Sequence, residues 1–522
     1  MGLLVTYWEC RLWKISSQKD EVDLGRIREL FSDTLVYGIS SVVARFINYL
    51  LVPFYTKFFD PAEYGIIGLI YGAIIFLNVL FQFGMESAYL RYAADRIISK
   101  DVFKTLQLLL LGAATLLALL FWLLSPLLMP LLSIDPTTQY LFLMMLGILW
   151  LDALSAVPFA ELRLVRKSWT FALTRLGSVI INVGLNLYFI IILEWGIEAI
   201  LIANLIASGV TMIVLAFFTF DQLSGSWNRS VLKKSLYFGL PYIPAGIGYA
   251  INETIDKFYL NQMSQSDITR LYGSEFTSEE ITGIYNACYK LAVFMLLTVQ
   301  MFRMAWQPFF MRHAKSEGVE KTFADIFLLY NLAAGIIFLV VGIFAEQIVQ
   351  IRIPVLDGTL IDSRYWMGLS IVPYLLLAYW FQGWYVNFTA GIFIAEQTRK
   401  LPLITLAGAV ITVSMNTLLI PIIGMQGAAL ATVACYATMS MMIFYYSRRY
   451  MPVPYNLGKA AFMMIIAGSA LFLSNSMAIP FFNEIMGKIT LLIISVILLG
   501  TLGLSNTYSF SNKKKDRGED PI

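Results

Sequence analysis

The hydrophobic residues of this chain fall into long runs that are separated by short polar segments. A membrane-spanning helix needs about 20 mainly apolar residues, and fourteen runs are long enough. They cover residues 34–58, 64–89, 105–132, 139–160, 170–193, 197–220, 237–261, 283–306, 324–350, 366–391, 401–420, 426–447, 457–475 and 487–506. The pattern predicts an all-α integral membrane protein with about 14 transmembrane helices, whose connections are too short to fold as soluble domains.

Lysine and arginine are distributed unequally between the two sides of these predicted helices. With the N-terminus inside, the inner segments carry 28 of the 37 Lys and Arg residues. The outer loops carry only Lys57, Arg270, Arg352, Arg364 and Lys488. Because cytoplasmic loops are enriched in Lys and Arg, both termini are predicted to be cytoplasmic.

An internal repeat divides the chain. Residues 65–82 match residues 283–300 at an offset of 218, and residues 186–203 resemble residues 416–434. The identical pairs in the first match are Gly65/Gly283, Ile66/Ile284, Tyr71/Tyr289, Phe76/Phe294 and Gln82/Gln300. Two six-helix lobes, related by an axis along the membrane normal, would produce this pattern.

The repeat implies five segments. An N-terminal cytoplasmic or interfacial segment precedes the first lobe, two added helices follow the second lobe, and a cytoplasmic tail ends the chain. Their predicted bounds are 1–33, 34–220 for the first lobe, 237–447 for the second lobe, 457–506 and 507–522.

Composition agrees with a membrane protein and excludes several functions. Only 14% of the residues are charged, against about 25% in soluble domains. A net charge of +3 is too small to indicate a nucleic-acid partner. The three cysteines and the single histidine, His313, have no metal-ligand spacing. The chain also has no GxxxxGK[ST] phosphate-binding loop, so transport must draw on an ion gradient, a substrate gradient or a partner.

Charged residues inside the predicted helices are candidates for function, because a charge at mid-bilayer costs at least a few kcal/mol. Arg45 and Asp152 lie near the centres of their helices, where they either bind a ligand or pair with each other. Lys290 lies in an outer half, at the position aligned with Gly72. A lysine where the other lobe has glycine favours a ligand contact over packing.

A second group of charges lies near helix ends. Glu253 and Lys257 are four residues apart, so they are expected to pair on one helix face. Asp256 and Lys257 then either contact the transported molecule or fasten their helix to the next one. Arg303, near an inner end, either anchors its helix at the interface or acts in the cavity. The segment "YWFQGWYVN" (379–387) mixes rings and amides, a chemistry often used for sugars.

Several stretches together resemble a known family. They are "DTLVYGISSVVARFINYLLVPFYTKFFDPAEYGIIGLIYG", "FGMESAYLRY", "IDKFYLNQ", "GIYNACYKLAVFMLLTVQMFRMAWQPFF" and "LITLAGAVITVSMNTLLIPIIGMQGAALATVACY". In order and spacing they are similar to the polysaccharide-biosynthesis, or O-antigen (Wzx-type), flippases of the multidrug/oligosaccharidyl-lipid/polysaccharide (MOP) superfamily. The resemblance covers roughly residues 25–450.

This resemblance implies a fold, a function and a site. The fold would be two six-helix lobes in a V, similar to MATE transporters. The substrate would be a polyprenyl-pyrophosphate-linked oligosaccharide, moved across the bacterial cytoplasmic (inner) membrane by alternating access. Cavity residues in matching positions are Arg45, Asp256, Lys257, Lys290 and Arg303. No cofactor is implied. The expected partners are membrane lipids, the lipid-linked oligosaccharide, a polysaccharide polymerase and other glycan-assembly proteins.

Three alternatives stay open. A multidrug or cation antiporter of the same superfamily would favour buried acids, and Asp152 and Asp256 are candidates for coupling to Na⁺ or H⁺. A flippase for lipid II or a teichoic-type lipid is a closer variant. A membrane enzyme, such as a polysaccharide polymerase or ligase, is less consistent with the sequence. Its usual large outer loop is missing, because the longest predicted outer loop, residues 262–282, has one Arg and no His.

Overall fold

The computed structural model describes residues 43, 47, 49–94, 97–314, 316, 318–476 and 484–515. Most of these residues are helical, as the hydrophobic pattern predicts. The candidate Arg45 lies outside the described residues, as do the predicted segment 1–33 and most of the first predicted membrane helix.

The described part of the first lobe is a bundle of helices that starts at the end of the first predicted membrane helix. Its helices are α3 (Val52–Phe58), α4 (Pro61–Gln82), α5 (Met85–Tyr92), α6 (Ser99–Leu123), α7 (Ser125–Leu128), α8 (Gln139–Leu164), α9 (Ser168–Leu187) and α10 (Glu198–Thr219). An amphipathic helix, α11 (Arg229–Gly239), connects this lobe to the next.

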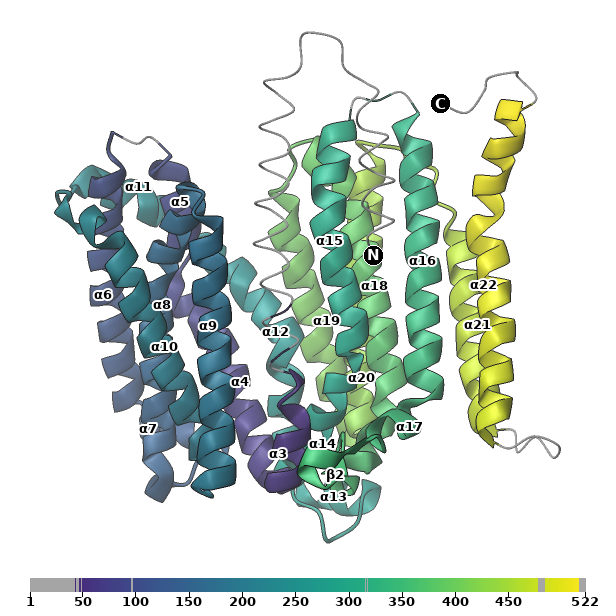
Figure 1. The fold of residues 1–522 in the computed structure, drawn as a ribbon, viewed down its shortest axis with the longest axis horizontal. Helices are drawn as coiled ribbons and strands as arrows, with labels where there is room; N and C mark the ends of the chain where they lie inside the picture. Colours follow the sequence, from purple (N-terminus) through teal and green to yellow (C-terminus); the bar gives the residue numbers. More distant parts are fainter. Residues whose placement is uncertain are drawn as a thin grey trace.

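The second lobe is larger and includes a small hairpin. Its elements are α12 (Tyr242–Asn261), α13 (Gln265–Leu271), α14 (Ser278–Tyr289), α15 (Val293–His313), α16 (Val319–Ile343), α17 (Ala345–Val349), the antiparallel strands β1 (Arg352–Ile353) and β2 (Gly358–Thr359), a 3₁₀ helix at Ser363–Ile371, α18 (Val372–Ile394), α19 (Lys400–Ile423) and α20 (Met425–Arg448). Two further helices, α21 (Leu457–Ser476) and α22 (Glu484–Lys515), pack beside α16 on the side away from the first lobe (Figure 1).

Within the described residues, 11 helices are long and apolar enough to cross a membrane. They match eleven of the fourteen predicted segments. Two other segments form the helices α12 and α18, which have 20 and 23 residues. These two are more polar, since α12 carries three charges and α18 carries Trp, Tyr, Gln and Asn. The number fourteen and the positions of the termini stay predictions.

The two bundles are joined more tightly at one end than at the other. Figure 1 shows them close together at the end with α3, α13 and α14, and farther apart at the end with α5 and α11. The first of these is called the outer end, because the Lys and Arg distribution predicts that it faces outside. One apolar cluster fills the second lobe and continues at the outer end into the first lobe, through Tyr64 and Ile67.

Helices α4 and α14 carry the closest contact between the lobes. Each starts with a capping box, Asp60–Glu63 in α4 and Thr277–Glu280 in α14, which satisfies the first free backbone N–H groups. The two helices then cross at Gly65 in α4 and Gly283 in α14. An ideal Cβ on Gly283 would lie only 2.9 Å from the backbone nitrogen of Gly65. Only glycine lets the two backbones approach this closely.

Candidate functional site

Asp256 on α12 joins its helix to α14. Its side chain is only 3% exposed. The hydroxyl of Tyr285 on α14 donates to Asp256 Oδ2 at 2.6 Å, and the backbone N–H of Lys257 donates to Oδ1 at 2.9 Å. The carboxylate is therefore held by two donors within the second lobe, one on its own helix and one on α14. Whether Asp256 also contacts the transported molecule stays a prediction.

Lys257, the next residue, has a different environment. Its side chain is 8% exposed, and its Nζ lies 5.1 Å from the ring centre of Tyr289 on α14. The predicted pairing with Glu253 does not occur among the ion pairs of the described residues. Glu253 instead accepts a hydrogen bond from the hydroxyl of Tyr436 on α20. Lys257 instead lines the cavity between the two lobes.

Lys290 lies where α14 gives way to α15. A short 3₁₀ turn, Lys290–Ala292, interrupts the long helix there. The Lys290 Nζ lies 5.7 Å from the ring centre of Tyr49 at the start of the described first lobe. Its charge and that of Lys257 repel each other. Among the residues that the structure describes, neither lysine forms an ion pair with a carboxylate.

Both lysines line a cavity of about 390 Å³ between the two lobes. The first lobe contributes α3, α4, α9 and α10 to its walls, and the second contributes α12, α14 and the 3₁₀ turn at Lys290. The polar lining includes Tyr55, Tyr71, Asn182, Asn204, Lys257, Asn286 and Lys290. Ammonium groups, amides and phenols together offer many donors, and aromatic faces near an ammonium add cation–π attraction. The arrangement suits an anionic, hydrogen-bonding ligand.

Asp152 lies elsewhere, inside the first lobe. The hydroxyl of Ser208 on α10 donates to its Oδ1 at 3.0 Å. The charge of Arg175 on α9 also attracts this carboxylate. Asp152 is not among the residues that line the cavity with the lysines. The predicted partner Arg45 lies outside the described residues, so the Arg45–Asp152 pair stays a prediction.

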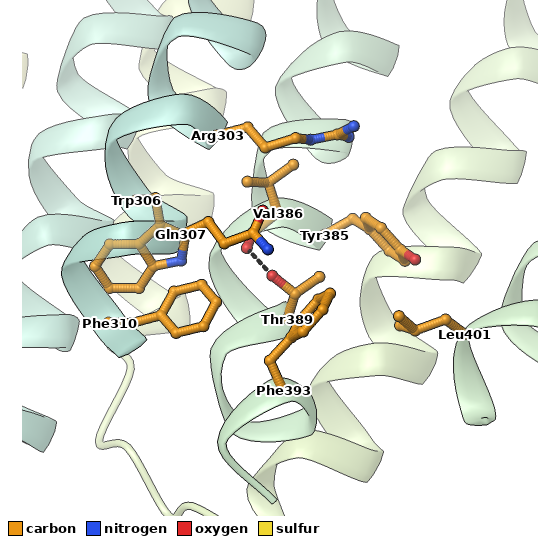
Figure 2. Close-up of a pocket in the computed structure, with 9 residues that line it drawn as sticks. All are labelled: Arg303, Trp306, Gln307, Phe310, Tyr385, Val386, Thr389, Phe393 and Leu401. Atoms are coloured by element: carbon orange, nitrogen blue, oxygen red, sulfur yellow. Dashed lines mark hydrogen bonds between the residues drawn. The ribbon is translucent and has the colours of Figure 1, made fainter. Parts of the chain in front are cut away.

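Arg303 lines a second, smaller pocket in the second lobe. This pocket holds about 230 Å³ and lies between α15, α18 and α19. In Figure 2, Arg303 extends from α15 toward Tyr385, above Gln307 and the rings of Trp306 and Phe310. Thirteen residues separate Lys290 from Arg303, or about 20 Å along a helix at about 1.5 Å per residue. The structure therefore places Arg303 apart from the lysine pair.

The aromatic stretch 379–387 serves mainly to pack the second lobe. The indole N–H groups of Trp380 and Trp384 both donate to the Oδ1 of Asn331, at 2.9 and 2.7 Å. Gln382 donates to the Tyr436 hydroxyl at 3.1 Å. All of these side chains are buried or nearly so, and of this stretch only Tyr385 and Val386 line the Arg303 pocket.

Sequence reasoning missed some of the cavity lining. Asn286 on α14 was not singled out, although it lies one turn before Lys290 on the same helix face. Tyr55 and Tyr71 were also not counted among the candidates, although Tyr71 belongs to the internal repeat. No group of three or more His, Cys, Asp or Glu side chains that could hold a metal ion occurs within the described part of the chain.

Solved structures identify the class of fold. The structure resembles an inward-facing multidrug resistance MATE family transporter of the MOP superfamily, with a TM-score of 0.62 and 16% identity over 80% of this chain and 97% of that chain. It resembles the lipid II flippase MurJ in an inward closed conformation, with a TM-score of 0.67 and 12% identity over 91% of this chain and 100% of that chain. A MOP superfamily transporter from Pyrococcus furiosus has a TM-score of 0.55 and 16% identity over 80% and 95% of the two chains.

The protein is a multi-pass membrane protein with the two-lobed fold of these MOP-superfamily transporters, as the sequence predicts. The family model for polysaccharide biosynthesis proteins matches residues 55–353, which is more than half of the 522 residues. The chain therefore belongs to the polysaccharide biosynthesis protein family. No curated protein matches its sequence significantly.

Proposed function

We propose that this protein is a flippase that moves a polyprenyl-pyrophosphate-linked oligosaccharide across the bacterial cytoplasmic (inner) membrane, for the synthesis of O-antigen, capsule or exopolysaccharide. The observation that carries this proposal is the pair Lys257 and Lys290. These two cations face a cavity lined by both lobes, and no ion pair neutralises them within the described part of the chain. The Asp256 carboxylate attracts Lys257 from the same helix, and a pyrophosphate group would add negative charge beside both lysines.

The polar cavity lowers the energetic cost of moving a pyrophosphate-linked oligosaccharide through the bilayer. A pyrophosphate and several sugars cannot cross about 30 Å of hydrocarbon unaided, because their polar groups would lose their water. The cavity offers ammonium groups, amides and phenols as substitutes, while the polyprenyl tail stays in the bilayer. Two lysines on adjacent helices attract the anion without the two-pronged grip of arginine, which favours release on the other side.

We assign a contact with the sugars to the pocket of Arg303. It combines the rings of Trp306 and Phe310 with the polar side chains of Arg303, Gln307 and Tyr385. Rings that stack on sugar faces and side chains that bind hydroxyl groups are the chemistry an oligosaccharide requires. A glycan of several sugars is long enough to extend from the lysine pair toward this pocket.

A multidrug or cation antiporter is the second candidate function. Asp152 supports it, since it is a carboxylate inside a membrane lobe with Ser208 and Arg175 beside it. The lysine pair opposes it, because two ammonium groups in the cavity repel a cationic substrate. We therefore propose Asp152 at most as a site that couples transport to Na⁺ or H⁺, and Asp256 less so because it is engaged by Tyr285.

The test is transbilayer movement in liposomes that contain the full purified chain. A fluorescent polyprenyl-pyrophosphate oligosaccharide is expected to cross without ATP, and a Na⁺ or H⁺ gradient is imposed in parallel to detect coupling. Lys257→Ala and Lys290→Ala should stop the movement, whereas Lys233→Ala on the exposed face of α11 should not. Equal movement of an analogue with an uncharged linkage, a strict need for ATP, or a covalently altered product would each contradict the proposal.

A further inference from the structure

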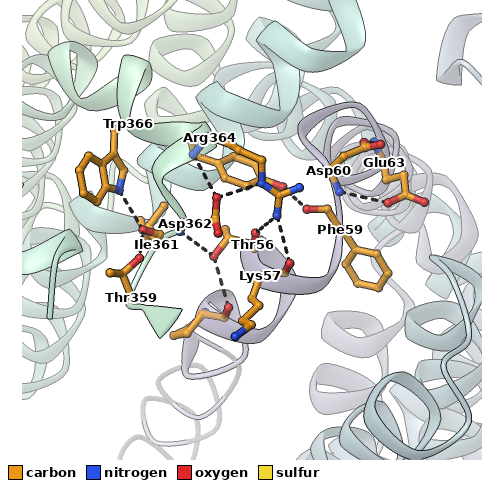
Figure 3. Close-up of polar contacts among 12 residues, drawn as sticks. Thr56, Lys57, Phe59, Asp60, Glu63, Thr359, Ile361, Asp362, Arg364 and Trp366 are labelled. Atoms are coloured by element: carbon orange, nitrogen blue, oxygen red, sulfur yellow. Dashed lines mark hydrogen bonds and ion pairs between the residues drawn. The ribbon is translucent and has the colours of Figure 1, made fainter. Parts of the chain in front are cut away.

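A small element of the second lobe reaches across the outer end to the first lobe. Strands β1 and β2 pair Arg352 with Thr359 and Ile353 with Gly358, and the 3₁₀ helix Ser363–Ile371 follows. Asp362 caps this helix, because its Oδ1 accepts from the backbone N–H of Arg364 at 3.1 Å. The hairpin and the start of the 3₁₀ helix lie directly beside α3 of the first lobe (Figure 3).

The contacts fall on the last turn of α3, whose carbonyl groups have no partner within the helix. One guanidinium nitrogen of Arg364 donates to the carbonyl oxygens of Thr56 and Lys57, both at 3.0 Å. The hydroxyl of Tyr365 donates to the carbonyl oxygen of Phe59 at 2.9 Å. A cation at a helix C-terminus also interacts favourably with the helix dipole.

A second cation makes the same kind of contact in the opposite direction. Lys57, on α3, donates its ammonium group to the carbonyl oxygen of Asp357 at 2.8 Å and to that of Leu356, both in the hairpin. Each lobe thus supplies one cation, and each cation binds backbone carbonyls of the other lobe. Asp362 orients Arg364, since its Oδ1 lies 2.9 Å from the Arg364 Nε.

The position of these bonds suits repeated breaking and remaking. The side chain of Arg364 is 43% exposed, so water can replace its partners when the lobes separate. The neighbouring Tyr365 is fully buried and meets Tyr64 of the first lobe edge-to-face, with ring centres 5.8 Å apart. The buried rings of Tyr64 and Tyr365 align the two lobes. The exposed cations add hydrogen bonds between the lobes that water can replace.

We propose that the reciprocal contact of Lys57 and Arg364 is a latch, which keeps the outer end closed and must open before the cavity can face outside. The proposal rests on the alternating access included in the proposed function, but it does not depend on which molecule is carried. Three of the outer cations predicted from the sequence, Lys57, Arg270 and Arg364, bind backbone carbonyls of another element. Two of these three form the latch.

The test measures the distance between the outer ends of the lobes. Spin labels are placed on Leu131→Cys of the first lobe and Thr269→Cys of the second, both exposed positions, in the full chain carrying Cys10→Ser. Cys288 and Cys435 are buried and stay unlabelled. Arg364→Ala and Lys57→Met should each raise the population with separated outer ends by about tenfold, as expected for the loss of a strong charge-assisted hydrogen bond.

The matched control is Arg352→Ala, which removes an exposed cation from the same hairpin without touching a cross-lobe bond in the described structure. If Arg364→Ala and Lys57→Met give the same distance distribution as Arg352→Ala, there is no latch. Arg364→Lys, which keeps the charge but loses the planar fork, should fall between the native protein and Arg364→Ala. Since no substrate is present, these outcomes do not depend on the proposed flippase activity.

A cross-link provides the second arm. The backbone N–H of Asp362 donates to the Thr56 hydroxyl at 3.3 Å, so these residues are adjacent across the lobes. Thr56→Cys combined with Asp362→Cys should form a disulfide that holds the outer end closed. Surface glycan export should stop in oxidising medium and return with a reductant. Export by the oxidised, fully cross-linked protein would overturn the proposal even if the flippase activity itself is correct.

Discussion

Helices α4 and α14 occupy corresponding places in the two lobes, yet they contribute different chemistry. Both begin with a capping box and both reach the crossing with a glycine, Gly65 in one and Gly283 in the other. Two turns further on, α4 has Gly72, and the aligned residue of the second lobe is Lys290, in the 3₁₀ turn that follows α14. The shared start builds the contact between the lobes, and the later difference places Lys290 on the second lobe's side of the cavity.

The glycines of α4 also make room for α14 and α12. An ideal Cβ on Gly68 would lie 2.9 Å from the side-chain nitrogen of Asn286, the residue aligned with it in the repeat. An ideal Cβ on Gly72 would lie 3.2 Å from the Phe258 ring of α12. The glycines of α4 leave room for side chains of α14 and α12. A helix of the repeat can therefore keep its packing position in both lobes while only the second lobe has the polar side chains of Asn286 and Lys290 at the aligned positions.

The largest expected effect comes from removing the charge that distinguishes the two helices. Lys290→Ala should abolish export of the surface polysaccharide, while the protein stays in the membrane. The measurement is surface glycan by immunoblot, with membrane-fraction protein as the reference. Lys290→Arg, which keeps the charge, should retain part of the export, and normal glycan on Lys290→Ala cells would remove Lys290 from the site.

The next largest effect is expected from the glycine crossing that α4 and α14 share. Gly283→Ala places a methyl group against the backbone of α4, so it should destabilise the protein by about 2 kcal/mol, as overpacking does, and reduce export. Thermal unfolding of the purified protein measures this. The matched control is Gly112→Ala in α6, where nothing lies within 4 Å of an added Cβ. Equal unfolding temperatures for the two variants would refute a tight crossing.

Exchanging the two residues tests whether the side of the cavity matters. Gly72→Lys combined with Lys290→Gly moves the charge to the first lobe within the same cavity. Export should partly recover relative to Lys290→Gly alone, because the cavity keeps two cations, at the cost of displacing the Phe258 ring. If the exchange gives no recovery, then the position of the charge on α14 is essential and not only its presence.

The smallest effect is expected at Asp256. Asp256→Asn keeps an oxygen that accepts from Tyr285, so stability should fall by only about 1 kcal/mol and export should stay near the native level. Unfolding and glycan export are measured on the same preparations. A stable Asp256→Asn protein that exports nothing would instead make this carboxylate part of ion coupling.

Much of the fold was accessible from the sequence because a bilayer allows few alternatives. Backbone groups in hydrocarbon must pair within their own segment, so long apolar runs become helices. Helix α18 was identified by its length, although its composition, with Trp, Tyr and amide residues, leaves it outside the 11 helices that are apolar enough to cross a membrane. The contact between Gly65 and Gly283 was not accessible, since an alignment shows that two glycines correspond but not that they touch.

The sequence singled out the two lysines that line the cavity, and their role in binding stays a prediction. Lys257 and Lys290 were found because charges in a membrane are costly, and both line the cavity. The hydrogen-bond partners of the charged residues on α12 could not be predicted from their spacing along the helix. Glu253 lies one turn from Lys257, but Tyr436 approaches it from a distant helix and binds it instead. Likewise, composition cannot distinguish rings that bind sugar from core rings such as Trp380, whose N–H is satisfied by Asn331.

The final two helices, α21 and α22, offer positions for probes that report the relative motion of the two lobes. Helices α21 and α22 pack on α16, with Leu471 against Gly342 and Leu499 against Gly335. They are therefore expected to travel with the second lobe as one rigid body. A fluorophore attached near the end of α21, paired with another on α6, would follow the rocking of one lobe against the other in real time, without a probe near the cavity or the hairpin.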